Sequence, residues 1–232
     1  MQINGWYQSV PAKGTAFAWA ESRVDPDGVA RDRTTESERT QYLQDVRAEL
    51  AFAHHSLGRR VIDFGAGSGW FLGALGEGWV KHGIEIDESA VRLWPKDVVR
   101  LPHLSHAEKC VHDLVICHHV IEHCRSPELI IGGLYDTLRH GGHMIFATPD
   151  FDSPCARRFG PAYRMFHDPT HISLFSRASA ERFLLDHWFA ILDVRYPFPE
   201  RYATAENFVR WNDARGVSPP WPGNWMTFYC RK

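Results

Sequence analysis

A short apolar run that ends in an acid and a glycine-rich turn constrains this chain most. Val61-Ile62-Asp63-Phe64 is followed by glycine at every second position, Gly65, Gly67 and Gly69. Glycine adopts positive φ and lets the backbone approach a ligand closely. The dinucleotide fingerprint GxGxxG needs a third small residue where this chain has Trp70, so it fits poorly. Taken alone, the turn leaves a structural role and a cofactor-binding role open.

A second strand is expected at 80–86. It ends in acidic residues, about twenty positions after the glycine-rich turn begins. Either Glu85 or Asp87 could accept hydrogen bonds from both hydroxyls of a ribose, as an acid does at this place in nucleotide-binding folds. A lone acid at a strand end is usually just solvated. The acid and the glycine turn together therefore favour a cofactor that contains a ribose.

Strands and helices alternate along the rest of the chain. Further strands are expected at 112–118, 143–148, 190–196 and 225–231. Helices are expected at 35–57, with Gly58 as its end, at 70–75, at 126–139, with a stop at Gly141-Gly142, and at 176–187. Such alternation predicts an α/β fold with a mostly parallel, doubly wound sheet, in which ligands bind at the carboxyl ends of the strands.

Charge and cysteine usage exclude several classes of protein. The formal net charge of the 232 residues is -2, and no basic run is longer than Arg157-Arg158, so no nucleic-acid partner is expected. The five cysteines contain no CxxC pair, which favours reduced thiols in a cytoplasmic protein. The N-terminus has no signal-peptide pattern, and no stretch reaches the roughly 18 apolar residues of a membrane span.

Five segments, in order and between about residues 59 and 196, carry a resemblance to a known family: VIDFGAGSG, HGIEID, HDLVICHHVIEHCRSP, GGHMIFATPD and HDPTHISLFS. With them the chain resembles the class I S-adenosylmethionine (SAM) dependent methyltransferases. It is most similar to the group that includes ubiquinone-pathway O-methyltransferases and methyltransferases of sugars and natural products. The resemblance implies a Rossmann-like, doubly wound, mostly parallel seven-stranded sheet and SAM as the cofactor.

The resemblance also implies how one methyltransferase domain over residues 1–232 is organised. Residues 1–35 would form an N-terminal extension or cap, and residues 36–148 the SAM-binding half. Residues 149–232 would supply an insertion on the acceptor side, at about 149–176, and the C-terminal strands.

On the methionine side of SAM, the family's residues correspond to Asp63, Gly65, Gly67 and Gly69, which would form the loop beside the cofactor. His118, just after the fourth strand, would border the methionine and the acceptor.

On the adenosine side, Glu85 would bind the ribose hydroxyls and Ile86 would lie on the adenine. Asp97 resembles the family acid near the adenine amino group. The family has a longer helix between these two acids, whereas Pro95 interrupts the short one in this chain, so residues 88–112 are expected to differ.

Three histidines are candidates for the base. O-methylation requires a deprotonated acceptor while the methyl group transfers in line, and histidine is well suited to take a proton near neutral pH. His171, in the segment expected to line the acceptor side, is the first candidate, followed by His119 and then by His167. A structural hydrogen bond is the alternative role of His171.

The segment His119-Val-Ile-Glu122-His123 raises the question of a metal. Ubiquinone O-methyltransferases and small-RNA 2′-O-methyltransferases have Glu-x-x-Glu-His here and can bind a divalent ion. This chain has one carboxylate fewer and one imidazole more, a set that suits zinc or iron better than magnesium. The alternative, which we expect, is that Glu122 and His123 hydrogen-bond to nearby loops and that no metal is bound.

These features predict methyl transfer from SAM to an oxygen or nitrogen of a small-molecule acceptor. One alternative is a methyltransferase fold that has lost activity and serves as a binding module. Another is an NAD-dependent oxidoreductase, which Trp70 disfavours. Tryptophans near the termini would either wall an acceptor pocket or fill a core, and a core position is expected for Trp225.

Overall fold

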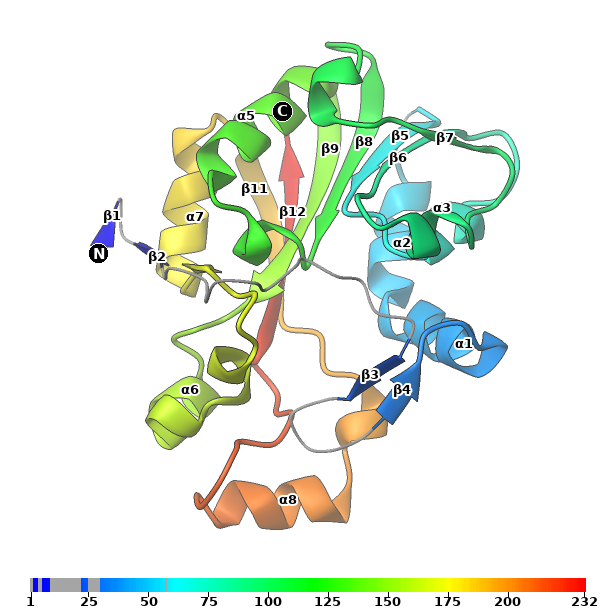
Figure 1. Ribbon diagram of the computed structural model, residues 1–232. Coiled ribbons are helices and arrows are strands. Elements are labelled where there is room, and N and C mark those ends of the chain that lie inside the picture. The colour runs from blue at the N-terminus through cyan, green and yellow to red at the C-terminus, as the bar shows by residue number, and fades with distance from the viewer. Residues whose placement is uncertain (1, 4–5, 9–21, 25–29, 57) are drawn as a thin grey trace.

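A computed structural model describes residues 2–3, 6–8, 22–24, 30–56 and 58–232, and a seven-stranded sheet forms its centre (Figure 1). The strand order is β11-β12-β9-β8-β5-β6-β7. The strands are β5 (Arg60–Phe64), β6 (Val80–Ile84), β7 (Val98–Arg100), β8 (His112–His118), β9 (Leu138–Pro149), β11 (Ala190–Arg195) and β12 (Trp225–Arg231). β12 is antiparallel to both neighbours, and the other pairs are parallel. The expected mostly parallel α/β sheet is confirmed.

Helices cover both faces of this sheet (Figure 1). Those on one side are α1 (Glu36–Asp45), α2 (Arg47–His54) and α3 (Trp70–Ala74), and those on the other are α5 (Pro127–Thr137) and α7 (Arg177–Asp186). Consecutive residues of β8 alternate between the two cores: Leu114 and Ile116 pack with the α2–α3 side, Val115 and Cys117 with the α5–α7 side. Burial on both faces explains why this strand is apolar without interruption.

The direction of strand addition reverses at β5. The chain first adds β6 and β7 on one side of β5, then crosses to add β8 and β9 on the other. The loops after β5 and β8 therefore diverge and leave a crevice at the carboxyl edge, where ligands bind in open α/β sheets. Both motifs found in the sequence end at this edge.

The single helix expected at 35–57 is two helices. Thr35 caps α1 by accepting a hydrogen bond from the Glu38 N–H, and the chain leaves helical geometry at Val46 before α2 begins. α2 ends at His54, so Gly58 is not its terminating residue. Glycine is required at 58 for another reason, because a Cβ there would collide with the Asp113 carboxylate.

The boundary after α5 also differs from the expectation. Pro127 occupies the first turn as predicted, although the Ser126 side chain makes no capping hydrogen bond. α5 ends at Thr137, and β9 begins at once, so Gly141 and Gly142 lie within this strand instead of stopping the helix. They exchange backbone hydrogen bonds with Lys232 at the end of the chain.

Segments that follow β9 and β11 extend beyond the carboxyl edge (Figure 1). They contain α6 (Pro154–Phe159), η3 (Gly160–Ala162), η4 (Arg164–His167), β10 (Ser173–Leu174), η5 (Glu200–Tyr202) and α8 (Ala205–Asn212). A separate apolar cluster, including Phe159 and Tyr163, holds this part together, with Trp211, Trp221 and Trp225 packed against it.

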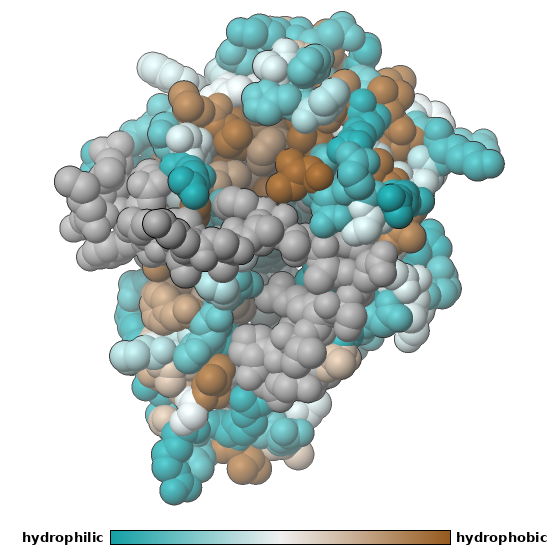
Figure 2. All heavy atoms as spheres, in the orientation of Figure 1, coloured by the Kyte–Doolittle hydropathy of each residue, from teal (hydrophilic) through white to brown (hydrophobic). Residues whose placement is uncertain are grey.

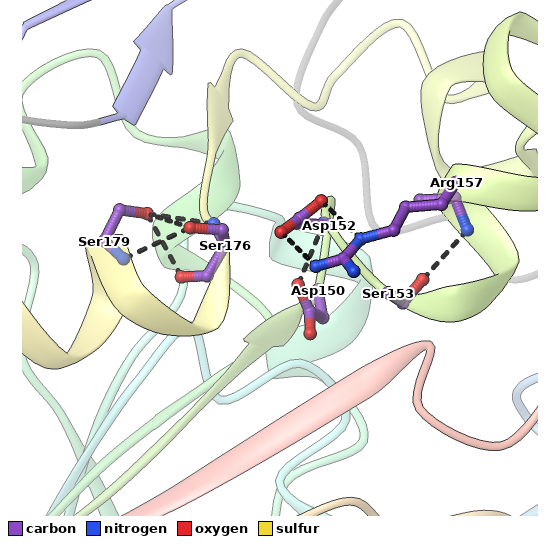
Figure 3. A network of polar contacts seen from close by, with 7 residues as sticks. Asp150, Asp152, Ser153, Arg157, Ser176 and Ser179 are labelled. Carbon is purple, nitrogen blue, oxygen red and sulfur yellow. Dashed lines mark hydrogen bonds and ion pairs between the residues drawn. The ribbon is translucent and has the colours of Figure 1, made fainter.

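Local polar contacts fix the ends of this insertion (Figure 3). Arg157 makes two bonds to the Asp152 carboxylate, at 2.9 and 2.7 Å, and Ser153 caps α6. At the other end Ser176 and Ser179 form a capping box at the start of α7. These contacts explain how a segment with little regular structure is held at the edge of the sheet.

The remaining elements are short: β1 (Gln2–Ile3), β2 (Trp6–Gln8), β3 (Ser22–Val24), β4 (Ala30–Asp32), α4 (Glu88–Val91), η1 (Leu104–His106) and η2 (Ile121–His123). β2 pairs with β10, and β3 pairs with β4. The N-terminal extension expected at 1–35 falls largely outside the described residues. Within the described residues, no helix has the length and apolar character that crossing a bilayer requires.

Candidate functional site

A cavity of about 1320 Å³ opens at the carboxyl edge of the sheet. Its wall includes the loops after β5, β6 and β8, parts of α1, α2 and α5, and the insertion that follows β9. Leu129 of α5 belongs to this wall and is 72% exposed. Figure 2 shows hydrophobic residues at the surface in the upper part of the molecule. One cavity thus joins the two sequence motifs to the expected acceptor side.

The loop after β5 requires glycine at three positions. Gly65, Gly67 and Gly69 have φ of 77°, 49° and 69°, a region that residues with a Cβ rarely adopt. A Cβ on Gly65 would lie 2.6 Å from Cγ2 of Val120. The Trp94 indole donates to the Gly67 carbonyl at 2.7 Å and fixes the loop from outside. The loop is a preformed cradle, and Gly65 and Gly67 line the cavity.

Glu85 connects this cradle to the end of β6. One carboxylate oxygen accepts from the Gly67 N–H at 2.9 Å, and the other accepts from the N–H groups of Ile86 and Asp87 at 2.7 and 3.0 Å. Three of the roughly four lone-pair sites of the carboxylate are thus occupied, and one, on the oxygen that accepts from Gly67, is left for a ligand hydroxyl. Asp87 instead caps α4 through the Ser89 N–H, and it does not line the cavity. Of the two acids that the sequence left open, Glu85 is the one at the site.

Ile86 lies beside Glu85 on the cavity wall with 67% of its surface exposed. An apolar side chain so placed offers a flat contact to a ring. Asp63 lies beneath the cradle and is 4% exposed. Burial, and then the Glu85 charge, raise the pKa of Asp63 to about 8.

Asp97 is a correction. It precedes β7, and β7 runs parallel to β6, so Asp97 lies at the amino edge of the sheet, opposite the cavity. Its carboxylate pairs with the buried Lys81 ammonium at 2.7 Å, an interaction that lowers the Asp97 pKa. The residues that follow β7 reach the cavity instead, among them Pro102 and His103. The helix before β7 is shorter here than in the family. The position that matches the family's adenine-side acid therefore does not lie at Asp97.

Glu122 is the centre of an imidazole cluster on the acceptor side. It is 1% exposed, and its Oε1 lies 3.4 Å from Nδ1 of His119. Burial acts to raise the Glu122 pKa, but the His119 hydrogen bond and the nearby His123, His119 and His171 charges outweigh it and bring the pKa to about 2. Thr148 Oγ1 donates to the other carboxylate oxygen at 3.3 Å. A buried carboxylate is therefore kept ionised by its neighbours.

His119 has a strained backbone. Its φ is +56°, which is uncommon for a residue with a Cβ and occurs often at functional sites. The His119 N–H donates to the Ala147 carbonyl at 2.9 Å, which ties the residue to the end of β9. The side chain is 31% exposed and lines the cavity. His119 is therefore accessible to a ligand and oriented by Glu122.

His118 precedes His119, lies at the end of β8 and also lines the cavity. The two rings meet edge to face with centroids 4.6 Å apart. Burial, and then the charge of His119, lower the pKa of His118 to about 3, so this imidazole is neutral at ordinary pH.

His171 lies deeper in the cavity wall, with 7% of its side chain exposed. Its Nδ1 lies 2.7 Å from the Met165 carbonyl oxygen, and His123 Nδ1 lies 3.1 Å from that of Thr170. The two rings are 4.9 Å apart. Burial is the main cause that lowers the His171 pKa. Both imidazoles are held by backbone carbonyls through Nδ1.

His167 is the second correction. It is exposed and does not line the cavity, because Arg164 and Met165 take the buried positions of η4 and leave Phe166 and His167 on the outer side.

Glu122, His123 and His171 could hold a metal ion. One ligand atom from each lies within 4.8 Å of the others. A histidine ligand usually donates its second ring nitrogen to a carbonyl, the arrangement seen for both imidazoles. The sequence pattern suggested His119 as the third ligand, whereas the fold brings His171 to this position.

Several cavity residues were not identified from the sequence, among them Tyr42 and Glu49 of the α1–α2 segment and Tyr202 of η5. Glu49 had a signal, since it occupies the apolar face of its helix, three positions after Val46 and four before Ala53. Trp225, expected in a core, lines the cavity and stacks on Tyr202 with ring centroids 5.7 Å apart.

Comparison with known proteins agrees with this geometry. The chain matches the family described as a methyltransferase domain over residues 35–194, more than half of its length. A stretch of 107 residues is 28% identical to a ubiquinone biosynthesis O-methyltransferase of Photorhabdus laumondii, and it covers 39% of this chain and 43% of that relative. The match thus spans less than half of the curated relative.

Solved structures share the fold. A SAM-dependent methyltransferase from Archaeoglobus fulgidus has a TM-score of 0.58 at 18% identity, over 83% of this chain and 94% of that one. The 1,6-didemethyltoxoflavin-N1-methyltransferase of Burkholderia thailandensis, with S-adenosylhomocysteine bound, has a TM-score of 0.58 at 13% identity, over 96% and 93%.

A doubly wound sheet with a glycine cradle and an acid at its switch point is the arrangement of α/β folds that bind a nucleoside-containing cofactor. The match over residues 35–194 shows that this chain belongs to the methyltransferase-domain family, so the resemblance and the predicted cofactor are confirmed. The NAD-dependent alternative is excluded with it.

Proposed function

We propose that this methyltransferase transfers the methyl group of SAM to an oxygen or nitrogen of a small-molecule acceptor, with His119 as the base. The contact between Glu122 and His119 Nδ1, at 3.4 Å, carries the proposal. The ionised carboxylate favours the tautomer with hydrogen on Nδ1, which leaves Nε2 to accept a proton from a ligand in the cavity.

The cofactor fits the residues present. The loop leaves no room for a Cβ at Gly65, where it would meet Val120, and the Glu85 carboxylate keeps one lone pair for a ribose hydroxyl. When bound, SAM supplies a methyl group on a sulfonium. Held there, SAM would supply this methyl group to an acceptor lone pair and would leave as its neutral thioether product, S-adenosylhomocysteine. The acceptor proton moves to His119 Nε2, and the buried Glu122 charge stabilises the imidazolium that results.

We assign His171 a positioning role, together with His123. Its Nδ1 is held by the Met165 carbonyl, and only 7% of its side chain is exposed, so it reaches a ligand less readily than His119 does. His171 remains the second candidate for the base. Its Nε2 lies 3.8 Å from the Asp168 carboxylate, which competes for the same nitrogen.

A small acceptor is supported by two similar proteins, one named for ubiquinone biosynthesis and one for a toxoflavin precursor. The test is to incubate the protein with labelled SAM and a panel of small phenols, alcohols and amines. Label transfer that disappears in His119→Gln but persists in His167→Gln is expected. Tight SAM binding without transfer to any compound would favour the alternative of an inactive binding module.

A further inference from the structure

Glu49 is a buried acid in the wall of the cavity that the proposed proton transfer does not use. It is 2% exposed and lies on the apolar face of α2, whose neighbouring residue Ala53 belongs to the core. A carboxylate on such a face is costly unless its oxygens find partners. Its position in the cavity wall therefore calls for an explanation.

Only one carboxylate oxygen of Glu49 has a side-chain hydrogen-bond partner among the described residues. Oε1 accepts from the Thr227 hydroxyl at 3.1 Å, whereas Oε2 has no hydrogen-bond partner among the described residues. Burial raises the pKa of Glu49, while hydrogen bonds to its own backbone and to Thr227 act in the opposite direction. Leaving a buried acceptor unsatisfied costs about 1–3 kcal/mol, which a ligand donor would recover.

Two cations of the cavity wall, Arg31 and Arg201, are paired with other acids. Arg201 binds Asp45 at 2.8 Å and Glu38 at 3.3 Å, and Arg31 binds Glu38 at 3.4 Å. Arg195, whose charge acts on Glu49, is paired with Asp193 at 2.7 Å. Two protein charges act on Glu49, those of His119 and then Arg195, and neither forms an ion pair with it among the described residues, so a cationic ligand can take this place.

Glu49 lies on the acceptor half of the cavity and not on the cofactor half. Its anchor, Thr227, is on β12, three strands from β5, a lateral distance of roughly 14 Å at the usual strand spacing. Thr227 pairs with Ala147 in the β12–β9 ladder. The Ala147 carbonyl in turn accepts a hydrogen bond from the His119 N–H. Glu49 and His119 are therefore anchored at the same level of the sheet, away from Glu85.

We propose that Glu49 is an acceptor-binding residue and that the acceptor carries a basic nitrogen, whose ammonium form pairs with Glu49 Oε2 beside His119. The proposal rests on the proposed function, since it assumes a small acceptor in this cavity. It narrows the acceptor to an amine, in which the basic nitrogen is either the atom methylated, after His119 has taken its proton and freed its lone pair, or a second anchoring group.

Calorimetry with matched ligands tests the proposal. Protein saturated with S-adenosylhomocysteine is titrated with tyramine and phenethylamine, and with their alcohol counterparts tyrosol and 2-phenylethanol. The amines are expected to bind at least tenfold more tightly than the alcohols. Glu49→Gln should remove this preference, and Glu77→Gln, on an exposed loop residue outside the cavity, should keep it.

Other outcomes overturn the proposal. They are equal binding of alcohols and amines, no binding of either amine, or an unchanged preference in Glu49→Gln. Weaker binding of S-adenosylhomocysteine in Glu49→Gln, with amine binding unchanged, would assign Glu49 to the cofactor instead. The comparison of amine binding with alcohol binding by the wild-type protein does not depend on whether a variant folds. Wild-type binding of the cofactor product with no amine bound would reject this proposal while leaving the methyltransferase function intact.

Discussion

The backbone N–H of Gly67 donates to the Glu85 carboxylate at 2.9 Å, so the glycine cradle and the neighbouring strand end form one unit. The two sequence motifs are 18 residues apart in the chain at these positions, yet they share one hydrogen bond. The glycine supplies the donor because its φ turns the loop toward β6. We therefore expect cofactor recognition to depend on this connection as much as on either motif.

Glu85→Ala should weaken SAM binding by about 1.5–3 kcal/mol, the scale of hydrogen bonds to a charged group. Calorimetry of the wild type and the variant measures the change, and NAD should bind neither protein. Asp97→Ala is the control, because Asp97 lies at the opposite edge of the sheet and SAM affinity should not change. Equal affinity in Glu85→Ala and the wild type would contradict the assignment of this strand end.

Gly65→Ala should destabilise the protein more than Gly76→Ala does. The two glycines have nearly the same φ, 77° and 76°, so alanine costs about 1–2 kcal/mol of backbone strain at either position. At Gly65 the new Cβ also meets Val120, whereas nothing lies within 4 Å at Gly76. Denaturant unfolding measures both free energies. Equal losses would show that Val120 moves aside without cost.

Asp63 should make the stability of the protein without cofactor depend on pH. Its pKa is raised from 3.8 to about 8 by burial and by Glu85, so the folded state favours the protonated acid. The stabilisation is complete below the unfolded pKa near 3.8 and is lost as the pH rises toward 8. Unfolding free energies measured from pH 4 to pH 8 should therefore fall relative to those of Asp63→Asn. Parallel curves for the two proteins would contradict the raised pKa.

The sheet, the glycine turn and Glu85 could be predicted because each depends on local pattern. Strand β8 is apolar throughout since both of its faces are buried, and the glycines are fixed by φ. Asp97 was misplaced although Pro95 indicated a short helix, because the sequence does not show where β7 begins, and the acid directly precedes that strand.

The acceptor side was predicted less well for a different physical reason. His119, Glu122 and His171 come together only through the insertion, where irregular loops leave no periodic pattern in the sequence. His167 and His171 lie four residues apart, but the turn of η4 directs only His171 into the wall. Tyr202 and Trp225 reach the cavity from the C-terminal part of the chain.

The two histidines of the acceptor side should respond differently to substitution. His119→Ala should lower kcat by about 10²–10⁴-fold, the usual contribution of a general base, while SAM affinity stays nearly unchanged. His171→Ala should instead lower the thermal stability, because it removes the bond to the Met165 carbonyl and opens a buried space. His167→Ala, at an exposed position, should change neither. A stable His171→Ala protein with a similar loss of kcat would make His171 the base.

The absence of a metal requirement remains a prediction. The Glu122 carboxylate is already held by the His119 hydrogen bond and by the Thr148 hydroxyl, and its pKa is lowered to about 2, so no metal cation is needed to keep this buried acid ionised. Activity should survive treatment with a chelator, and elemental analysis of protein purified without added metal should find well under one equivalent. Denatured protein analysed in parallel controls for an ion that the chelator cannot reach. A stoichiometric ion whose removal abolishes turnover would contradict the prediction.

The ligands would then be Glu122, His123 and His171, whose ligand atoms lie within 4.8 Å of one another. Zinc or iron would be the expected metal, because two of the three ligands are imidazoles.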